Sequence, residues 1–418
     1  MAQKKKKIKF VIIILVFIVY FIMAARPVPR EIILAPRWIS SLESIPLAGS
    51  ILTENFLTTD GNPYINSHSA ADPSHIQQLN LLPFVLGSRF GYVDSSGEFL
   101  INRMISHYIA LSDNMWTEYG PEPVNIVIND ILDGSQTVID NAGGYPVLLD
   151  NRIFIFGSEQ NSLSEIDSNG IKWTYEFGAT LTCIDAAADL VVTGSLDGIV
   201  EVFSSDGERI FFFEPGGSRF STIYGVSISR NGSHIGIISG IDQQRFLLLE
   251  RSGNNGVEYK VIYHEFLGTG FRRPVRIMFI DEDQRIVFER MGGIGCYNIR
   301  SRRAMFIPLD GEISAMDNSG DRGFLFLITS HPNYTGSVDF HERKLIGIKF
   351  PPDRLFGLSR TAARDTIFLE APFRSSNVFL GSFQTSGLRT SGSHVYSQAS
   401  LLVTGGASAL ICFELEEK

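Results

Sequence analysis

Two stretches of this chain repeat each other: residues 157–173 read GSEQNSLSEIDSNGIKW, and residues 194–210 read GSLDGIVEVFSSDGERI. They align without a gap at an offset of 37 residues, and glycines, serines and apolar positions coincide. In both stretches a short apolar run lies between two turn signals. The repeat therefore predicts a recurring unit that consists of a turn, a strand and a second turn.

Weaker copies of the same unit occur elsewhere in the chain. Gly240 and Gly253 keep the 13-residue gap that separates the glycines of the first two units, and residues 403–405 repeat the Val-Thr-Gly of residues 192–194. Tetrapeptides such as Asp94-Ser-Ser-Gly97 separate many of the apolar runs. Asp and Asn bond their own backbone and Gly adopts positive φ, so these tetrapeptides favour tight hairpins.

The spacing of the units predicts the architecture. Offsets of 37 and 46 residues bracket the about 40–45 residues of a four-stranded propeller blade. Residues 81–418 number 338, which accommodates seven such blades, with eight as the alternative. A ring of small sheets buries both faces of each sheet against its neighbours. We predict an all-β fold, a β-propeller of four-stranded blades, in which a strand within residues 81–95 completes the last blade.

The repeated units also resemble a known family. SLSEIDSNGIKWTYEF and IVEVFSSDGERIFFF resemble the strand–turn–strand unit of PQQ-like and WD40-like β-propellers of bacterial envelopes, with Asp167, Gly170 and Trp173 on the pattern, followed by Asp206 and Gly207. The resemblance implies a propeller. The adjacent cysteine pair of quinone-dependent alcohol dehydrogenases is missing from the sequence, so we expect no quinone and no other cofactor.

The N-terminus predicts a membrane segment. Residues 1–7 form a short basic tail, and an apolar run that includes Phe10 to Ala25 follows it. Basic residues before an apolar segment stay on the cytoplasmic side. We interpret residues 8–25 as one transmembrane helix that acts as a signal anchor, with a cleaved signal peptide as the alternative. Residues 26–80 are expected to be a tether, with a short helix or edge strand near residues 37–47, and residues 81–418 are expected to be the propeller.

Charge excludes one class of partner. The chain has 36 basic and 45 acidic residues, and seven of the basic ones lie in residues 1–30. The remainder therefore carries 29 basic residues against 45 acidic ones, a net charge of −16. Such a domain repels phosphate backbones, so nucleic acid is not an expected partner.

The sequence contains no recognisable catalytic or metal-binding motif. HExxH, GxSxG, GxxxxGK and GxGxxG are all missing from it. Cys183, Cys296 and Cys412 are far apart and lie in apolar runs, so we expect buried thiols, with one disulfide as the alternative. Residues 281–284 (DEDQ) are interpreted as a hairpin turn. We therefore assign no catalytic residue and no metal ligand.

Two groups of arginines contrast with the acidic background: Arg272, Arg273 and Arg276, then Arg302 and Arg303. Guanidinium groups bind carboxylates and phosphates through two parallel hydrogen bonds. On the expectation that loops at this spacing meet on one face, we predict a site for an anionic ligand or an acidic partner. Two solvated turns are the alternative.

These features favour a binding protein. We expect a non-catalytic protein-interaction scaffold, anchored in the inner membrane by a single pass, with its C-terminal domain in the periplasm and envelope proteins as partners. The architecture is similar to the propeller subunit of the outer-membrane β-barrel assembly machinery, which implies a role in envelope assembly or maintenance. A propeller hydrolase, lactonase-like or glycosidase-like, with its site at the central channel is the alternative.

Overall fold

The computed structural model describes only part of the chain. The described residues are 32–43, 81–252, 258–318, 324–331, 342–350, 367–373, 379–383, 401–405 and 409–417. Within these ranges the regular structure is β-strand, and no helix is long and apolar enough to cross a membrane. The predicted membrane segment, residues 8–25, lies outside the described residues.

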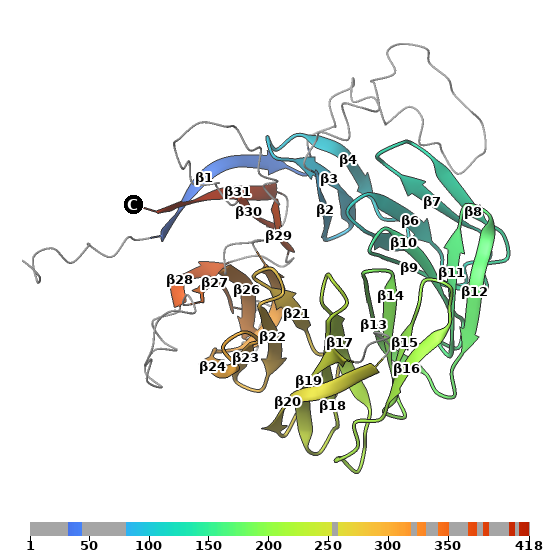
Figure 1. Cartoon of the computed structure of the whole chain (residues 1–418). Coiled ribbons are helices and arrows are strands. Elements are labelled where there is room, and N and C mark those ends of the chain that lie inside the picture. The colour runs from blue at the N-terminus through green and yellow to red at the C-terminus, as the bar shows by residue number, and fades with distance from the viewer. Residues whose placement is uncertain are drawn as a thin grey trace, which may run out of the picture.

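The strands form a ring of small antiparallel sheets (Figure 1). In the described ranges seven sheets have four strands and one has three. The three-stranded sheet comprises β2 (Leu81–Leu86), β3 (Arg89–Asp94) and β4 (Phe99–Met104). The predicted all-β propeller of four-stranded blades is therefore confirmed with seven such blades, and the three-stranded sheet takes its own place in the ring.

Six of the four-stranded sheets are each continuous in sequence, with the first strand innermost. They are β5–β8 (Tyr108–Leu111, Met115–Tyr119, Ile126–Asp130, Gln136–Ile139), β9–β12 (Gly144–Leu149, Arg152–Gly157, Ser162–Asp167, Gly170–Glu176), β13–β16 (Leu181–Ala187, Leu190–Ser195, Val200–Phe203, Arg209–Phe213), β17–β20 (Ile223–Ile228, His234–Ser239, Gln244–Ser252, Glu258–Gly268), β21–β24 (Ile277–Ile280, Arg285–Arg290, Gly293–Asn298, Arg303–Pro308) and β25–β28 (Glu312–Asn318, Phe324–His331, Glu342–Lys349, Ile367–Phe373).

The seventh four-stranded sheet combines the two ends of the chain. Its strands are β29 (Phe379–Phe383), β30 (Leu401–Gly405), β31 (Ala409–Glu417) and β1 (Ile32–Ser41), in the order β29-β30-β31-β1. β1 pairs antiparallel with β31, from Ile32 opposite Glu417 to Ser41 opposite Ala409. The closing strand was expected within residues 81–95, and this expectation is wrong. The closing strand lies in the segment expected to be a tether, and residues 81–94 belong to β2 and β3 of the next sheet.

Side chains around β1 also attach it to the neighbouring sheet. The Trp38 indole Nε1 donates to the Ser95 carbonyl at 3.0 Å, and the Ser40 hydroxyl donates to the Gly97 carbonyl at 2.5 Å. A Cβ at Gly97, whose φ is +92°, would lie 2.7 Å from the Trp38 ring. The Asn102 amide donates to the Leu42 carbonyl at 2.9 Å. β1 therefore completes one sheet and holds the next one against it.

The repeated Asp and Gly residues form turns, as predicted. Asp167 Oδ1 accepts the Asn169 N–H at 2.7 Å, and Gly170 follows with φ +112°. In the next unit the Ser204 hydroxyl accepts the Glu208 N–H at 3.3 Å, and Gly207 has φ +78°. The Asp167 and Ser204 side chains accept hydrogen bonds from the local backbone, so they shape the hairpins.

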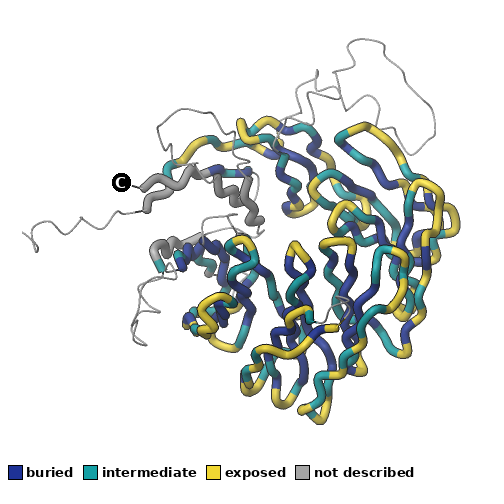
Figure 2. The backbone as a smooth tube through the Cα atoms, in the orientation of Figure 1, coloured by how far each residue is buried: buried dark blue, intermediate teal, exposed yellow. Residues whose placement is uncertain are grey.

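The hydrophobic core lies along the strands and between consecutive sheets (Figure 2). In one cluster Trp173 and Phe154 of β9–β12 pack with Phe203 of β13–β16, and the Trp173 and Phe203 rings stack at 5.9 Å. At the interface between β17–β20 and β21–β24, the Phe246 ring stacks on the Phe288 ring with centroids 4.1 Å apart. Both interfaces use side chains from two sheets, so the neighbouring sheets stabilise one another.

A buried carboxylate joins two sheets by polar contacts. Glu165 on β11 accepts hydrogen bonds from Arg152 at 3.0 and 2.6 Å and from the Trp173 indole at 2.7 Å. Arg152 also donates to the Leu190 carbonyl of the following sheet at 3.2 Å. Burial alone raises the pKa of Glu165, but Arg152, Trp173 and Lys172 together outweigh it and hold that pKa below its ordinary value.

This carboxylate predicts a pH dependence of stability. A depressed pKa adds stability above the unfolded value, 4.5 for glutamate, and this stability is lost as the pH falls through the folded pKa. Glu165→Gln should therefore lower the free energy of unfolding by about 2 kcal/mol at pH 7, and the deficit should shrink below pH 4.5. Urea titrations at several pH values measure this loss of unfolding free energy, and Glu176→Gln, a change at an exposed residue, is the control. A deficit that does not change with pH would contradict this assignment.

Candidate functional site

Strand direction divides the turns of the ring between two faces. One face carries the links between consecutive sheets, and neighbouring segments there bond through their backbones: the Leu196 N–H donates to Thr180, and the Gly240 N–H donates to Thr222, at 2.8 and 2.9 Å. We call this the linker face; it comprises residues 105–107, 120–125, 140–143, 158–161, 177–180, 196–199, 214–222, 240–243, 269–276, 291–292 and 309–311. The opposite, hairpin face comprises residues 95–98, 112–114, 131–135, 150–151, 168–169, 188–189, 204–208, 229–233, 281–284 and 299–302.

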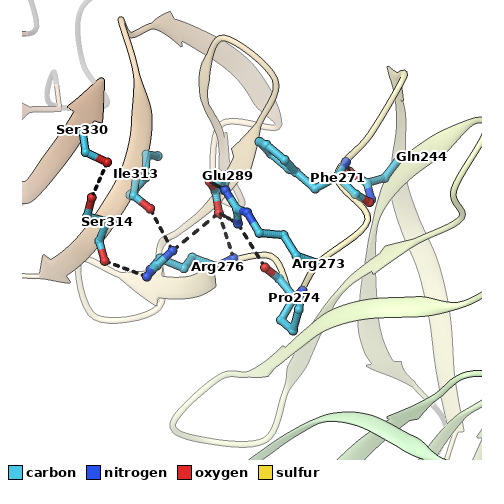
Figure 3. A network of polar contacts seen from close by, with 9 residues as sticks. All are labelled: Gln244, Phe271, Arg273, Pro274, Arg276, Glu289, Ile313, Ser314 and Ser330. Atoms are coloured by element: carbon cyan, nitrogen blue, oxygen red, sulfur yellow. Dashed lines mark hydrogen bonds and ion pairs between the residues drawn. The ribbon is translucent and has the colours of Figure 1, made fainter. Parts of the chain in front are cut away.

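Arg273, a predicted anion-binding residue, binds a carboxylate of its own chain. Its guanidinium donates to both oxygens of Glu289 at 3.0 and 2.6 Å and to the Pro274 carbonyl at 3.1 Å (Figure 3). It also lies 4.3 Å from the centroid of the Phe271 ring. The Glu289 side chain is only 1% exposed. Arg273 therefore neutralises a buried charge, as the bidentate chemistry implies, but the anion is internal.

Arg276 links two sheets. It donates to the Ile313 and Ser314 carbonyls on β25 at 2.9 and 2.7 Å, and its guanidinium lies 3.9 Å from Glu289 (Figure 3). A planar guanidinium presents five N–H donors in a fixed fork and so bonds both carbonyls at once. Arg276 is therefore a structural residue of the interface between β21–β24 and β25–β28.

The two arginine groups do not meet. Arg276 directly precedes Ile277, the first residue of β21. Ile280, the last residue of β21, pairs with Arg285, Arg285 pairs with Asn298, and Asn298 pairs with Arg303. Arg303 therefore lies at the level of Ile280. Four residues of extended strand separate these levels, about 13 Å. Arg302 occupies the turn before Arg303 on the hairpin face, with φ +54°. The expectation of one shared face is wrong, because antiparallel strands place these two connections at opposite ends of the sheet.

Arg272 is the member of the first group that lies on an exposed part of the linker face. It follows Phe271, whose backbone N–H and carbonyl both bond the Gln244 amide at 3.3 and 3.2 Å. The same Gln244 donates to the Gly240 carbonyl at 3.3 Å. This amide fixes the segment that carries Arg272 against residues 240–243.

Consecutive linker-face segments that lead up to Arg272 carry exposed apolar and charged side chains. Leu196 and Phe220 are 56% and 53% exposed, although both are large and apolar. The Arg219 guanidinium lies 5.6 Å from the Phe220 ring centroid. A hydrogen bond from Ser218 holds the pKa of Asp242 below its ordinary value, so this carboxylate is charged at neutral pH. We call this surface the linker-face patch; it comprises Leu196, Asp197, Arg219, Phe220, Asp242 and Arg272.

The backbone of the patch is fixed by bonds between the segments that form it. The Ser221 and Thr222 hydroxyls donate to the Asp197 and Leu196 carbonyls, both at 2.9 Å. On the other side, the Ile241 N–H donates to the Phe220 carbonyl at 3.1 Å. An exposed aromatic ring, two arginines and a pre-ordered backbone are typical of a protein-binding hot spot.

Sequence reasoning missed Leu196 and Phe220. Phe220 lies in the segment EPGGSRFS, residues 214–221, where glycine, proline and serine predict only a loop. The available signal was an aromatic residue in a loop that has no hydrophobic neighbours to bury it. Exposure alone is ordinary for single apolar residues, so the patch is recognisable only after the fold brings four separate segments together.

The described residues offer no metal centre and no disulfide. Within them, no three His, Cys, Asp or Glu side chains gather closely enough to hold a metal ion. Cys183, Cys296 and Cys412 are in no disulfide, and burial raises the pKa of Cys183 and of Cys296 to about 12. Of the two interpretations of the cysteines, the structure supports buried thiols.

The amino-acid sequence is similar to that of a bacterial protein. An uncharacterized protein from Treponema pallidum (strain Nichols) is 27% identical over 237 residues, which cover 56% of this chain and 62% of that protein. The chain therefore matches less than two thirds of that relative's length.

Among solved structures, the computationally designed Ika8 protein is similar over 79% of this chain and 92% of its own, with a TM-score of 0.53 and 12% identity. A chain of a mitotic checkpoint complex is similar over 84% of this chain and 97% of its own, with a TM-score of 0.47 and 11% identity. At 12% identity, the likeness to Ika8 shows the fold alone. A model of the beta-propeller protein family matches residues 1–380, most of the sequence, and the chain belongs to that family.

Proposed function

We propose that the chain is a non-catalytic scaffold of the cell envelope, in which the linker-face patch binds a partner protein. One observation carries the proposal: an exposed Phe220 with an arginine over its ring lies on a backbone that two neighbouring sheets fix in place. A pre-ordered surface loses little entropy on binding, and aromatic and arginine side chains supply most of the affinity of protein interfaces.

The chemistry of the patch suits a partner with an acidic and apolar surface. Leu196 and Phe220 supply apolar area, and Arg219 and Arg272 supply positive charge at the rim. Asp197 and Asp242 alternate with these arginines, so the patch discriminates by charge pattern rather than by net charge. Arg272 therefore remains a candidate for binding acidic groups of the partner. Arg219 joins it, in place of Arg273, Arg276, Arg302 and Arg303.

The anchor determines how the ring faces the membrane in this proposal. Residues 8–25 cross the membrane, and residues 26–31 are the six residues between them and Ile32. Six residues span at most about 21 Å. Along β1, Trp38 bonds the hairpin-face turn 95–98 and Leu42 bonds Asn102 farther toward the linker face. Ile32 therefore starts on the hairpin side, which faces the membrane, and the linker-face patch points away from it toward periplasmic proteins.

The proposal predicts the effect of changes in the patch. The double variant Phe220→Asp/Arg272→Glu should reduce recovery of the partner at least about tenfold in a crosslinking pull-down from membranes, because it removes one apolar and one charged contact. The measurement is quantitative mass spectrometry of the recovered envelope proteins.

Phe212→Asp is the matched control, because Phe212 is 48% exposed and lies on the outer strand β16. It should leave recovery unchanged. Equal recovery by all three chains, or equal loss by the control, would refute the assignment of binding to the patch.

A further inference from the structure

A second feature of the linker face is a cluster of three tyrosines from three strands. Tyr108 begins β5 and pairs with Tyr119 at the end of β6. Their rings stack with centroids 5.7 Å apart, and Tyr145 on β9 meets Tyr119 edge-on at 6.4 Å. β5 and β9 are the first strands of adjacent sheets and contact each other, so the cluster lies where these two sheets meet on the linker face.

The tyrosine cluster is accessible and held in position. Tyr108 is 53% exposed, and Val124 in the adjoining loop is 59% exposed. The Tyr145 hydroxyl donates to the Pro121 carbonyl at 3.3 Å, and the Ala142 N–H donates to the Val124 carbonyl at 2.7 Å. The loops on both sides of the rings are therefore tied together, while one ring of the stack remains open to solvent.

The charged side chains in the loops beside the cluster have one sign. The adjoining loops 105–107, 120–125 and 140–143 contain Glu122 and Asp140, both exposed, and no lysine or arginine. Glu118, next to Tyr119, accepts the Ser106 N–H at 2.9 Å. These loops differ from the linker-face patch, which combines two arginines with two aspartates.

Aromatic rings beside carboxylates recognise cations. The face of an aromatic ring attracts an ammonium or guanidinium group, and carboxylates at the rim add a favourable charge interaction. We infer that the tyrosine cluster binds a lysine or arginine side chain of a partner protein, with Glu122 and Asp140 facing its charge. The inference rests on the proposed function, because it assigns a second contact to the same partner-binding face.

Two contacts with different charge patterns on one face would fix the orientation of a bound partner. The tyrosine cluster takes a basic side chain of the partner, and the linker-face patch takes a surface whose apolar and charged groups match its alternating arginines and aspartates. A partner turned by half a revolution would then lose the match at both contacts, which electrostatic complementarity disfavours.

The test uses small probes and needs no partner. Blocked pentapeptides Gly-Gly-Xaa-Gly-Gly, with Xaa as arginine, lysine, citrulline or glutamate, are titrated into the full chain in detergent, and the ring signals of the tyrosines are followed by NMR. We expect saturable shifts of Tyr108, Tyr119 and Tyr145 with arginine and lysine only. Citrulline keeps the shape of arginine without its charge, so equal shifts with citrulline or glutamate, or no shift with any peptide, would overturn the inference.

Variants separate the roles of the ring and the charge. Tyr108→Leu keeps apolar area and removes the ring face, and it should weaken binding of the arginine peptide about fivefold. Glu122→Gln should weaken binding and reduce its dependence on salt. Phe212→Leu, a change at an exposed ring elsewhere, is the control and should have no effect. Unaltered affinity in both Tyr108→Leu and Glu122→Gln would reject the site.

The outcome is distinguishable from failure of the proposed function. Loss of the linker-face patch as a binding site would appear in the pull-down, while arginine-peptide binding by the tyrosines would persist. Conversely, absent peptide binding with a patch-dependent pull-down would remove the tyrosine site alone.

Discussion

Deletion of residues 32–43 should unfold the ring, although these residues are less than a tenth of the part of the chain that the structure describes. They contain β1, which forms nine residue pairs with β31 along the terminal sheet. Without it, the core between the terminal sheet and β2–β4 loses Leu42 and Trp38, and Leu410 and Cys412 are uncovered. We expect a loss of at least about 5 kcal/mol, which is the whole stability of many domains.

Urea unfolding followed by tryptophan fluorescence, together with limited proteolysis, measures this effect. A closed ring unfolds as one unit because every sheet depends on its neighbours, so the deletion should affect protease sensitivity far from β1 as well. Ile39→Ser is the control on the same strand, since Ile39 is 67% exposed, and it should change stability by no more than about 0.5 kcal/mol. A truncated chain with the midpoint of the full chain would contradict closure by β1.

Arg273→Ala should cost about 3 kcal/mol. It leaves the Glu289 carboxylate, 1% exposed, with Arg276 at 3.9 Å as its remaining charged neighbour. Breaking a buried ion pair on one side costs about 3–5 kcal/mol, and the lower end applies here because the Arg273 side chain is 35% exposed.

A second substitution tests the cause of this loss. Adding Glu289→Gln to Arg273→Ala removes the unpaired charge, and it should recover more than half of the lost stability. Unfolding free energies of the two single variants and the double variant give the coupling energy directly. A double variant that is less stable than Arg273→Ala alone would show that the loss comes from packing and not from an unpaired charge.

The repeat predicted the parts of the fold that depend on neighbouring residues. The turns at Asp167 and Gly207 and the strands beside them follow from local turn chemistry, and they could be placed from residues 157–210 alone. Closure could not be placed in this way, because β1 meets β31 across nearly the full length of the chain. Pro36 also disguises the strand: proline is tolerated at an edge, and the pairing is irregular there, between Pro36 and Trp38.

The candidate site was less predictable, for the same reason. Arg273 and Arg276 look unpaired in sequence because their partner, Glu289, lies on β22, the second strand after them, which no local pattern reveals. Phe220 looks like a loop residue until the fold places it between Leu196 and residues 240–243. Short-range patterns identify turns and strands, whereas ion pairs and surface patches form between segments that only the fold brings together.

Site-specific photocrosslinking in intact membranes determines which face of the ring meets the partner. A photoreactive residue is placed at position 196 or 220 on the linker face, and at position 168 or 206 in hairpin-face turns. We expect one shared protein adduct from positions 196 and 220, lost in the Arg272→Glu background, and no such adduct from positions 168 and 206. Adducts that form only from the hairpin face, or equally from both faces, would refute binding at the linker-face patch.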